Sequence, residues 1–219
     1  MRSLVIGASG GIGAALVAEL GQQGEVIGIS RSKDGLDITD EAALAKAMDR
    51  LTGPFDTIFI ATGALEIGGA RPEKSLRAIS FDTMAAQLAL NAIGPVLVVK
   101  YALRLLPKDR CARIGVLSAR VGSIGDNALG GWYSYRAAKA ALNQLIHTAS
   151  IEVARSHPQA VLACLHPGTV GTDLTKNYAA GHPVVTPQVA ARNLVQVLHA
   201  MTAAQSGTFA DWRGETIPW

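Results

Sequence analysis

Tyr135 and Lys139 are the residues whose types and spacing best fit proton transfer. Of the four tyrosines, Tyr135 is the one with a lysine four residues later. On a helix this spacing places both side chains on one face. A free phenol has a pKa of about 10, and a nearby ammonium lowers it by favouring the phenolate. The pair therefore predicts a general acid/base on a helix running to about Val153, and its alternative is an ordinary helix face.

A glycine-rich segment near the N-terminus has the composition of a phosphate-binding turn. Residues 4–13 form a short apolar run that leads into Gly7, Gly10, Gly11 and Gly13, and a stretch rich in Ala and Leu follows. This order predicts a strand, a tight turn and a helix whose free N–H groups attract phosphate. The segment indicates a dinucleotide-binding loop, with a purely structural turn as the alternative.

The elements that must position these residues alternate along the chain. Short apolar, β-branched runs alternate with longer helical patterns, which predicts a parallel sheet covered on both faces. We expect one α/β domain over residues 1–219, a Rossmann fold with a doubly wound, mostly parallel sheet, whose ligands bind beyond the carboxyl ends of the strands. The expected strands are 3–8, 25–30, 57–62, 113–118 and 160–166, with 207–219 as an edge strand.

Composition excludes several classes of protein. With 219 residues, 49% hydrophobic and 17% charged, the chain is suited to a single globular domain. The net charge of +3 is scattered, so we expect no nucleic-acid partner. The uncharged, apolar stretch 83–99 contains Gln87, Asn91, Gly94 and Pro95 and is too short for a membrane span. The first apolar run leads directly into the glycine turn and leaves no room for a signal peptide, which indicates the cytoplasm.

Cysteine and histidine spacing argues against metal or disulfide chemistry. Cys111 and Cys164 stand far apart, and none of the five histidines belongs to a ligand pair. We therefore expect two free thiols and no metal.

The order of the motifs is similar to that of a known family. Gly7-x-x-x-Gly11-x-Gly13 followed by Tyr135-Arg-Ala-Ala-Lys139 resembles the short-chain dehydrogenase/reductase family over essentially the whole chain, and residues 130–143 are most similar to its C-factor-like branch. The resemblance implies that Tyr135 gives a proton to a substrate carbonyl oxygen while NADPH delivers hydride. It also implies that Lys139 holds the nicotinamide ribose.

Asn91 is a third candidate for the catalytic site. It lies in an Ala- and Leu-rich helical stretch that continues through Gly94 and Pro95. Proline has no N–H, so the carbonyl of Asn91, four residues earlier, is left open for water. The resemblance implies an active-site Asn at a helix kink, relaying protons through water towards Lys139. The alternative is a structural kink.

The serine of the family pattern is displaced. The resemblance implies a Ser three residues before Gly122, where Ala119 stands. Ser118 is our candidate for the group that orients the carbonyl, and Ser123 is another, although neighbours on an extended segment point to opposite faces. If no serine reaches the site, Tyr135 supplies most of the oxyanion stabilisation, which favours slow catalysis or a binding role.

The second expected strand ends where NAD-dependent enzymes carry a ribose-binding acid, and Arg31 stands there. A guanidinium can grip a 2′-phosphate, so NADP(H) is favoured over NAD(H), with a surface arginine as the alternative. The resemblance implies that Asp37 contacts the adenine. Asp37 could also cap a helix, although Thr39 and Asp40 suit that role better.

The remaining cofactor contacts follow from the same resemblance. Residues 166–172 resemble the P-G-x-V-x-T segment, in which Val170 and Thr172 hold the nicotinamide carboxamide. His166 is interpreted as structural. The full expected set is Gly7, Ser9, Gly10, Gly11, Ile12, Gly13, Ser30, Arg31, Asp37, Ile38, Ala61, Gly63, Tyr135, Lys139, Pro167, Gly168, Val170 and Thr172.

The substrate side is predicted from the segment that follows. Residues 173–186 are expected to form a lid that excludes water, and with Ile124, Trp132 and Tyr133 to line a pocket for a small or flat carbonyl compound. Thr186 and Pro187 read as the start of the last long helix.

The sequence thus predicts an NADP(H)-dependent carbonyl reductase or alcohol dehydrogenase acting on a small carbonyl or alcohol substrate. Family resemblance implies a homodimer or homotetramer. The alternative is a dinucleotide-binding sensor or signalling protein with little turnover.

Overall fold

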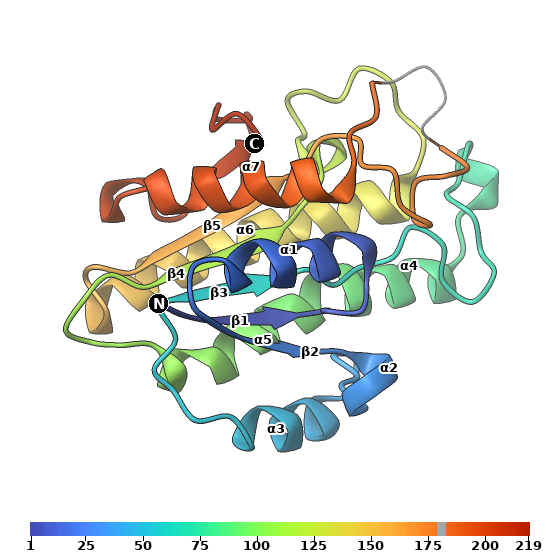
Figure 1. Ribbon diagram of the computed structural model, residues 1–219. Coiled ribbons are helices and arrows are strands. Elements are labelled where there is room, and N and C mark those ends of the chain that lie inside the picture. The colour runs from blue at the N-terminus through green and yellow to red at the C-terminus, as the bar shows by residue number, and fades with distance from the viewer. Residues whose placement is uncertain (179–182) are drawn as a thin grey trace.

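The computed structural model describes residues 1–178 and 183–219 (Figure 1). In these ranges a sheet of six parallel strands has the order β2-β1-β3-β4-β5-β6. The expected strands are all present. The first four end one or two residues earlier than predicted, the end of β5 matches, and β6 ends eight residues earlier. The strands are β1 (Arg2–Ile6), β2 (Glu25–Ile29), β3 (Thr57–Ile60), β4 (Arg113–Leu117), β5 (Val161–His166) and β6 (Phe209–Asp211).

Helices cover both faces of the sheet, which confirms the doubly wound α/β fold. Alternate residues of a strand face opposite sides, and Leu4 and Ile6 accordingly belong to one core cluster while Val5 belongs to the other. Helices α3, α5 and α6 pack on the first side, and α1 and α7 pack on the second. The longer helices are α1 (Gly11–Gly21), α3 (Glu41–Asp49), α4 (Phe81–Leu88), α5 (Gly94–Ala102), α6 (Tyr133–Ser156) and α7 (Pro187–Ala200), and a short α2 spans Arg31–Asp34.

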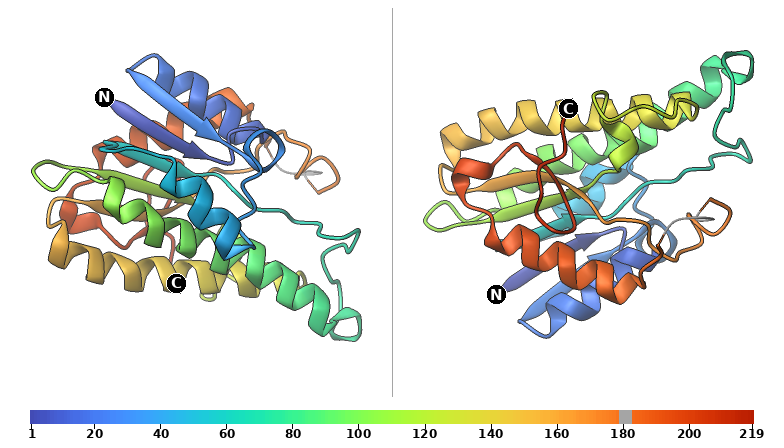
Figure 2. Two further views of the ribbon diagram at one scale, coloured as in Figure 1. Left: turned by 90° about the horizontal axis from the view of Figure 1, so that it is seen from below. Right: turned by 90° about the horizontal axis from the view of Figure 1, so that it is seen from above.

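The strand order places a crevice at the carboxyl ends of β1 and β3. The chain passes from β1 to β2 on one side and then returns to β3 on the other side of β1. Loops that leave such neighbouring strands in opposite directions open a space between them. The loop between β3 and α4 and the segment after β5 both project beyond this end of the sheet (Figure 2).

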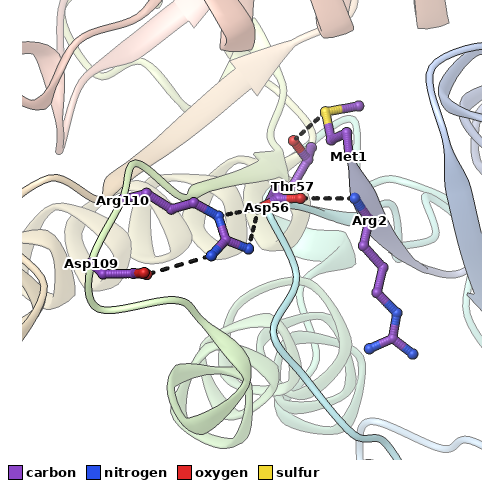
Figure 3. A network of polar contacts seen from close by, with 6 residues as sticks. All are labelled: Met1, Arg2, Asp56, Thr57, Asp109 and Arg110. Carbon is purple, nitrogen blue, oxygen red and sulfur yellow. Dashed lines mark hydrogen bonds and ion pairs between the residues drawn. The ribbon is translucent and has the colours of Figure 1, made fainter.

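The opposite, amino end of the sheet is held by ionic contacts (Figure 3). The Asp56 carboxylate accepts the backbone N–H of Arg2 at 2.8 Å and pairs with the Arg110 guanidinium at 2.8 Å. Burial raises the pKa of Asp56, but the Arg2 N–H and the Arg110 guanidinium outweigh it and hold this pKa below its usual value. Asp56 precedes β3, so these contacts tie the starts of β1 and β3 to the loop before β4.

One continuous helical stretch, Phe81–Leu105, is long and apolar enough to cross a membrane, with a mean hydropathy of 1.5. It comprises α4, a π-helical segment over Ala89–Ile93, α5 and a final 3-10 turn. Its residues Val98, Val99 and Ala102 are buried in the core, and Figure 1 shows it packed along the sheet. We therefore assign it as a core helix.

The C-terminal residues return to the carboxyl end of the sheet. The expected edge strand over 207–219 is present as the short β6. Beyond it, Pro218 O accepts the Ser123 hydroxyl at 2.5 Å and Trp219 O accepts the Gly125 N–H at 2.8 Å. The last helix starts as predicted, because the Thr186 side chain caps the N–H of Val189 and Pro187 is the first residue of α7.

Candidate active site

A cleft of about 1380 Å³ lies at the carboxyl ends of β1, β3, β4 and β5. This volume exceeds the roughly 300–1,000 Å³ usual for one small ligand, which leaves room for a dinucleotide and a substrate together. Its lining comes from residues 9–13, 61–65, 117–121, 166–176 and parts of 126–139, with Tyr178 and Val184. The cleft is therefore lined by the loops after the carboxyl ends of the strands, where the sequence predicted the ligand-binding residues.

The glycine loop fits a phosphate by its shape. Gly7 has a φ of +88°, and a Cβ on Gly13 would lie 2.1 Å from the carbonyl oxygen of Gly7. A Cβ on Gly11 would lie 2.7 Å from Thr172 Cγ2. Within the described chain no side chain caps the start of α1 at Gly10, so the first N–H groups of that helix point free into the cleft. A pyrophosphate would satisfy them.

The loop after β3 closes the same cleft from the other side. A Cβ on Gly63 would lie 2.7 Å from Asn91 Oδ1 and 3.6 Å from Lys139 Nζ, which makes glycine necessary for this close approach. The buried hydroxyl of Thr62 has no hydrogen-bond partner among the described residues. Ala61 and Gly63, both predicted cofactor contacts, line the cleft.

The residues predicted for the adenosine end lie outside the lining of this cleft. Ser30 caps α2, and Arg31, the first residue of that helix, is exposed. Ile38 is buried in the core against Gly94.

Asp37 forms a local turn. Its Oδ1 accepts the N–H of Thr39 at 2.9 Å and the Thr39 hydroxyl at 2.6 Å. These two hydrogen bonds lower its pKa, and the charge of Arg31 adds to the effect. The helix cap belongs to Asp40, whose carboxylate accepts the N–H groups of Ala42 and Ala43, as the sequence favoured.

Tyr135 and Lys139 lie one turn apart near the start of α6, at the floor of the cleft. Both are buried, with 8% and 3% exposed. Lys139 Nζ lies 5.9 Å from the Tyr135 ring centroid and donates to Leu117 O at 3.0 Å. Burial raises the pKa of Tyr135 to about 12 and lowers the pKa of Lys139 to about 8. The predicted lowering of the phenol pKa is absent here, because burial outweighs the ammonium at this distance.

Asn91 lies in the π-helical segment between α4 and α5 and is fully buried. The helix kink expected near Asn91 is therefore present as a π-helical segment over Ala89–Ile93. Such segments often occur at functional sites. Asn91 Oδ1 accepts the Ala64 N–H at 3.2 Å, and Asn91 Nδ2 donates to Ala64 O at 2.9 Å. Its amide thus holds the loop after β3.

The serine candidates have other partners. Ser118 lines the cleft, but its hydroxyl donates to Asn143 Oδ1 at 2.7 Å. Ser123 does not line the cleft and donates to Pro218 O. Ala119 lines the cleft and offers a methyl group at the position of the family serine. A role for Ser118 in orienting a carbonyl remains a prediction.

The segment after β5 borders the predicted nicotinamide position. Pro167, Gly168, Val170 and Thr172 all line the cleft. His166 also lines it, and burial lowers its pKa to about 4, so its ring is neutral near pH 7. Its Nδ1 has no partner in the described part of the chain.

The predicted lid, 173–186, is described at 173–178 and 183–186. Residues 179–182, which include Gly181 and His182, lie outside the described residues. Tyr178 crosses the cleft to donate to Glu66 Oε1 at 2.5 Å, and its ring meets the edge of Trp132 at 5.3 Å.

Of the three aromatic or apolar residues predicted for the substrate pocket, Trp132 alone lines the cleft. Ile124 is 77% exposed and Tyr133 is outside the lining, so both predictions are wrong. Trp132 has a φ of +53°, and this left-handed turn directs the chain into α6. Its ring centroid lies 6.3 Å from that of Tyr135.

Sequence reasoning missed two buried residues that support the site. Glu73, 4% exposed, accepts the N–H and hydroxyl of Ser134, and its backbone carbonyl accepts the Trp132 N–H. It therefore caps α6 directly before Tyr135. Gln87 accepts a hydrogen bond from Asn91 at 2.6 Å. Its spacing of four residues before Asn91 was the available signal.

Within residues 1–178 and 183–219, no group of three or more His, Cys, Asp or Glu side chains is arranged to hold a metal ion. Cys111 and Cys164 are free.

Comparison with known proteins agrees with these motifs. Residues 2–183 match the short chain dehydrogenase family. The chain is 30% identical over 236 aligned positions to 1-hydroxy-2-glutathionyl-2-methyl-3-butene dehydrogenase of Rhodococcus sp. strain AD45, covering 99% of this chain and 98% of that protein. It is 31% identical over 178 positions to C-signal of Myxococcus xanthus, covering 80% of this chain and 99% of the relative.

A solved structure also matches over the full length. A short-chain dehydrogenase/reductase from Burkholderia multivorans with bound NADP superposes with a TM-score of 0.85 at 28% identity, covering 100% of this chain and 99% of that one. The resemblance inferred from the glycine loop and the Tyr-Lys pair is therefore confirmed. The chain belongs to the short-chain dehydrogenase/reductase family of NAD(P)-dependent oxidoreductases.

Proposed function

We propose that the protein is an NADP(H)-dependent carbonyl reductase or alcohol dehydrogenase in which Tyr135 is the general acid/base. The observation that carries this proposal is the burial of Tyr135 and Lys139 at the floor of a cleft that starts at an uncapped, glycine-lined helix N-terminus. The substrate is a small molecule with a carbonyl or hydroxyl group.

Different residues of the cleft would bind the cofactor and transfer the proton. The cofactor supplies hydride transfer when bound. The glycine loop would hold its pyrophosphate, and Val170, Thr172 and Lys139 would hold its nicotinamide end. With a pKa of about 12 the Tyr135 phenol is protonated at neutral pH, so it is in the form that gives a proton to a carbonyl oxygen. Because Ala119 offers no hydroxyl, Tyr135 is the main hydrogen-bond donor to that oxygen.

The preference for NADP(H) rests on Arg31. Its exposed guanidinium follows β2 at the start of α2 and is free to pair with a 2′-phosphate. The Burkholderia relative was solved with NADP, which supports the same choice. Arg31→Ala is expected to weaken NADPH binding and to leave NADH binding unchanged, as measured by nucleotide fluorescence.

The experiment that tests the function is a titration with NADPH, NADH, NADP and NAD, followed by a panel of aldehydes and ketones monitored by nicotinamide absorbance. Tyr135→Phe is expected to reduce turnover by about 10²–10⁴-fold while NADPH still binds. Tyr133→Phe, two residues earlier and outside the cleft lining, is the matched control. Equal turnover in Tyr135→Phe and wild type would refute the role of Tyr135.

A dinucleotide-binding sensor is the second candidate, favoured by Ala119 at the serine position and by the similarity to C-signal. This function predicts NADPH binding without turnover across the panel. It also predicts that Tyr135→Phe changes nothing in the response to the nucleotide.

We further propose a cytoplasmic homodimer or homotetramer. Light scattering after size-exclusion chromatography decides the oligomeric state, and a monomer at micromolar concentration would contradict it.

A further inference from the structure

Gln87 is a buried amide in an apolar helix. It lies on α4, four residues before Asn91, and is 3% exposed. A polar side chain is buried in this way at little loss of stability when both ends of its amide are hydrogen-bonded. Both ends of Gln87 are.

The two hydrogen bonds of Gln87 fix the orientation of its side-chain amide. Its Nε2 donates to Leu65 O at 2.9 Å, so its Oε1 is left to accept from Asn91 Nδ2 at 2.6 Å. Because that contact requires the NH₂ group of Asn91, it determines which way the Asn91 amide faces. Asn91 Oδ1 is then directed at the N–H of Ala64.

The same contacts set the position of the loop after β3. Gln87 and Asn91 together bind the backbone of Ala64 and Leu65 through three hydrogen bonds, to Ala64 N, Ala64 O and Leu65 O. Gly63, the preceding residue, approaches Asn91 Oδ1 and Lys139 Nζ so closely that a Cβ there would be 2.7 Å and 3.6 Å from them. A displacement of this loop would therefore reach Lys139.

We propose that Gln87 is a positioning residue of the active site: it orients the Asn91 amide and thereby holds the loop 63–65 against Lys139. The effect on catalysis rests on the proposed function, whereas the effect on the loop does not. Gln87 itself does not line the cleft, and it acts through Asn91 and through its own bond to Leu65 O.

The test compares Gln87→Met, which keeps the length of the side chain and removes both hydrogen bonds, with Asn91→Ala and with the double variant. Gln144→Met on the exposed face of α6 is the matched control. The first readout is amide hydrogen exchange of residues 61–66 in the protein without cofactor. Exchange of the Ala64 amide is expected to be about tenfold faster in Gln87→Met, as the loss of a neutral hydrogen bond predicts.

The second readout is enzymatic. Gln87→Met is expected to lower kcat and to raise the dissociation constant of NADPH, each by about three- to tenfold. Because Gln87 acts partly through Asn91, the same change made in Asn91→Ala should have a smaller effect, which comes from the direct bond to Leu65 O alone. A purely packing role would instead give additive effects in the double variant.

The outcomes separate the two proposals. Unchanged exchange of residues 61–66 in Gln87→Met, or full additivity with Asn91→Ala, overturns the positioning role. Faster exchange in Gln87→Met that is smaller in the Asn91→Ala background supports it, even if the wild-type protein turns over no carbonyl compound. That last result would count against the proposed function alone.

Discussion

The two ends of the parallel sheet are built on different principles. At the amino end the Asp56 carboxylate accepts the backbone N–H of Arg2 and pairs with the Arg110 guanidinium (Figure 3). At the carboxyl end Tyr135 and Lys139 are buried 5.9 Å apart with no carboxylate partner in the described part of the chain. Ion pairs and buried polar atoms without partners occur at both ends, so the two ends differ in the burial of Tyr135 and Lys139 without such a partner.

This difference shows which end is built for stability. Pairing lowers the pKa of Asp56 and so contributes to the free energy of unfolding. Burial moves the pKa of Tyr135 up and that of Lys139 down, which destabilises their charged forms. The carboxyl end therefore keeps reactive groups at a loss of stability that the rest of the fold offsets.

The largest expected effect comes from closing the carboxyl end with a single methyl group. In Gly13→Ala the new Cβ would lie 2.1 Å from Gly7 O, so the loop or α1 must move. Such overpacking costs about 1–3 kcal/mol, and we expect NADPH affinity to fall at least about tenfold in a fluorescence titration. Gly21→Ala at the other end of α1, where a Cβ meets nothing within 4 Å, is the control and should bind normally.

Asp56→Asn removes the carboxylate that pairs with Arg110 at the amino end of the sheet. We expect the free energy of unfolding at pH 7 to fall by about 1–2 kcal/mol in urea, with NADPH affinity unchanged. The folded pKa of Asp56 is lowered, so its contribution is present above the unfolded pKa and is lost as pH falls through the folded value. The variant should lose that part of the acid dependence. Glu25→Gln, which breaks an exposed ion pair with Arg2, should have less effect.

Lys139→Met tests the carboxyl end of the sheet through the pH dependence of stability. The pKa of Lys139 is about 8 in the folded protein and about 10.5 when unfolded, so the unfolded state binds more protons between these values. Relative to Lys139→Met, the wild type should therefore gain stability as pH rises from 8 to 10, because both proteins share the contributions of Tyr135 and Cys164, which titrate near 10 and 9 when unfolded. Thermal unfolding at several pH values should show no such gain in Lys139→Met. An identical slope in both proteins would contradict the assignment.

Ser118→Ala should have the smallest effect. Its hydroxyl is bound to Asn143, so we expect a loss of turnover well below the roughly 10²-fold typical of an acid/base group. A loss of that size would restore Ser118 as the group that orients the carbonyl. Ser123→Ala serves as the comparison, since its hydroxyl binds Pro218 O outside the cleft.

The sequence predicted the sheet because its strands are buried on both faces. Leu4, Val5 and Ile6 are all fully buried, and such strands read as apolar runs. The Tyr135–Lys139 pair was equally visible, since four residues make one helical turn. Four strand ends were predicted one or two residues late, because small residues such as Gly7, Ser30 and Ser118 follow the last sheet pair and do not mark the boundary.

Other features depend on distance in sequence and could not be predicted. Glu73 caps α6 although it lies 61 residues before Ser134, and no local sequence pattern predicts a contact at that separation. The placement of Tyr133 and Ile124 was wrong because the direction of a side chain in a loop, or at the start of a helix that follows one, depends on loop backbone angles such as the φ of +53° at Trp132. The phenol pKa was also missed, because the depth of burial is a tertiary property.

The bonds from Pro218 and Trp219 to Ser123 and Gly125 give the protein an order of assembly during synthesis. Ser123 and Pro218 are 95 residues apart, so the ribosome makes the glycine loop, Tyr135 and Lys139 long before the partners of the 123–125 loop. We expect a chain ending at residue 217 to bind NADPH and yet be cleaved by proteases near Gly125. The cofactor side of the cleft would then be complete before the neighbouring 123–125 loop has its partners.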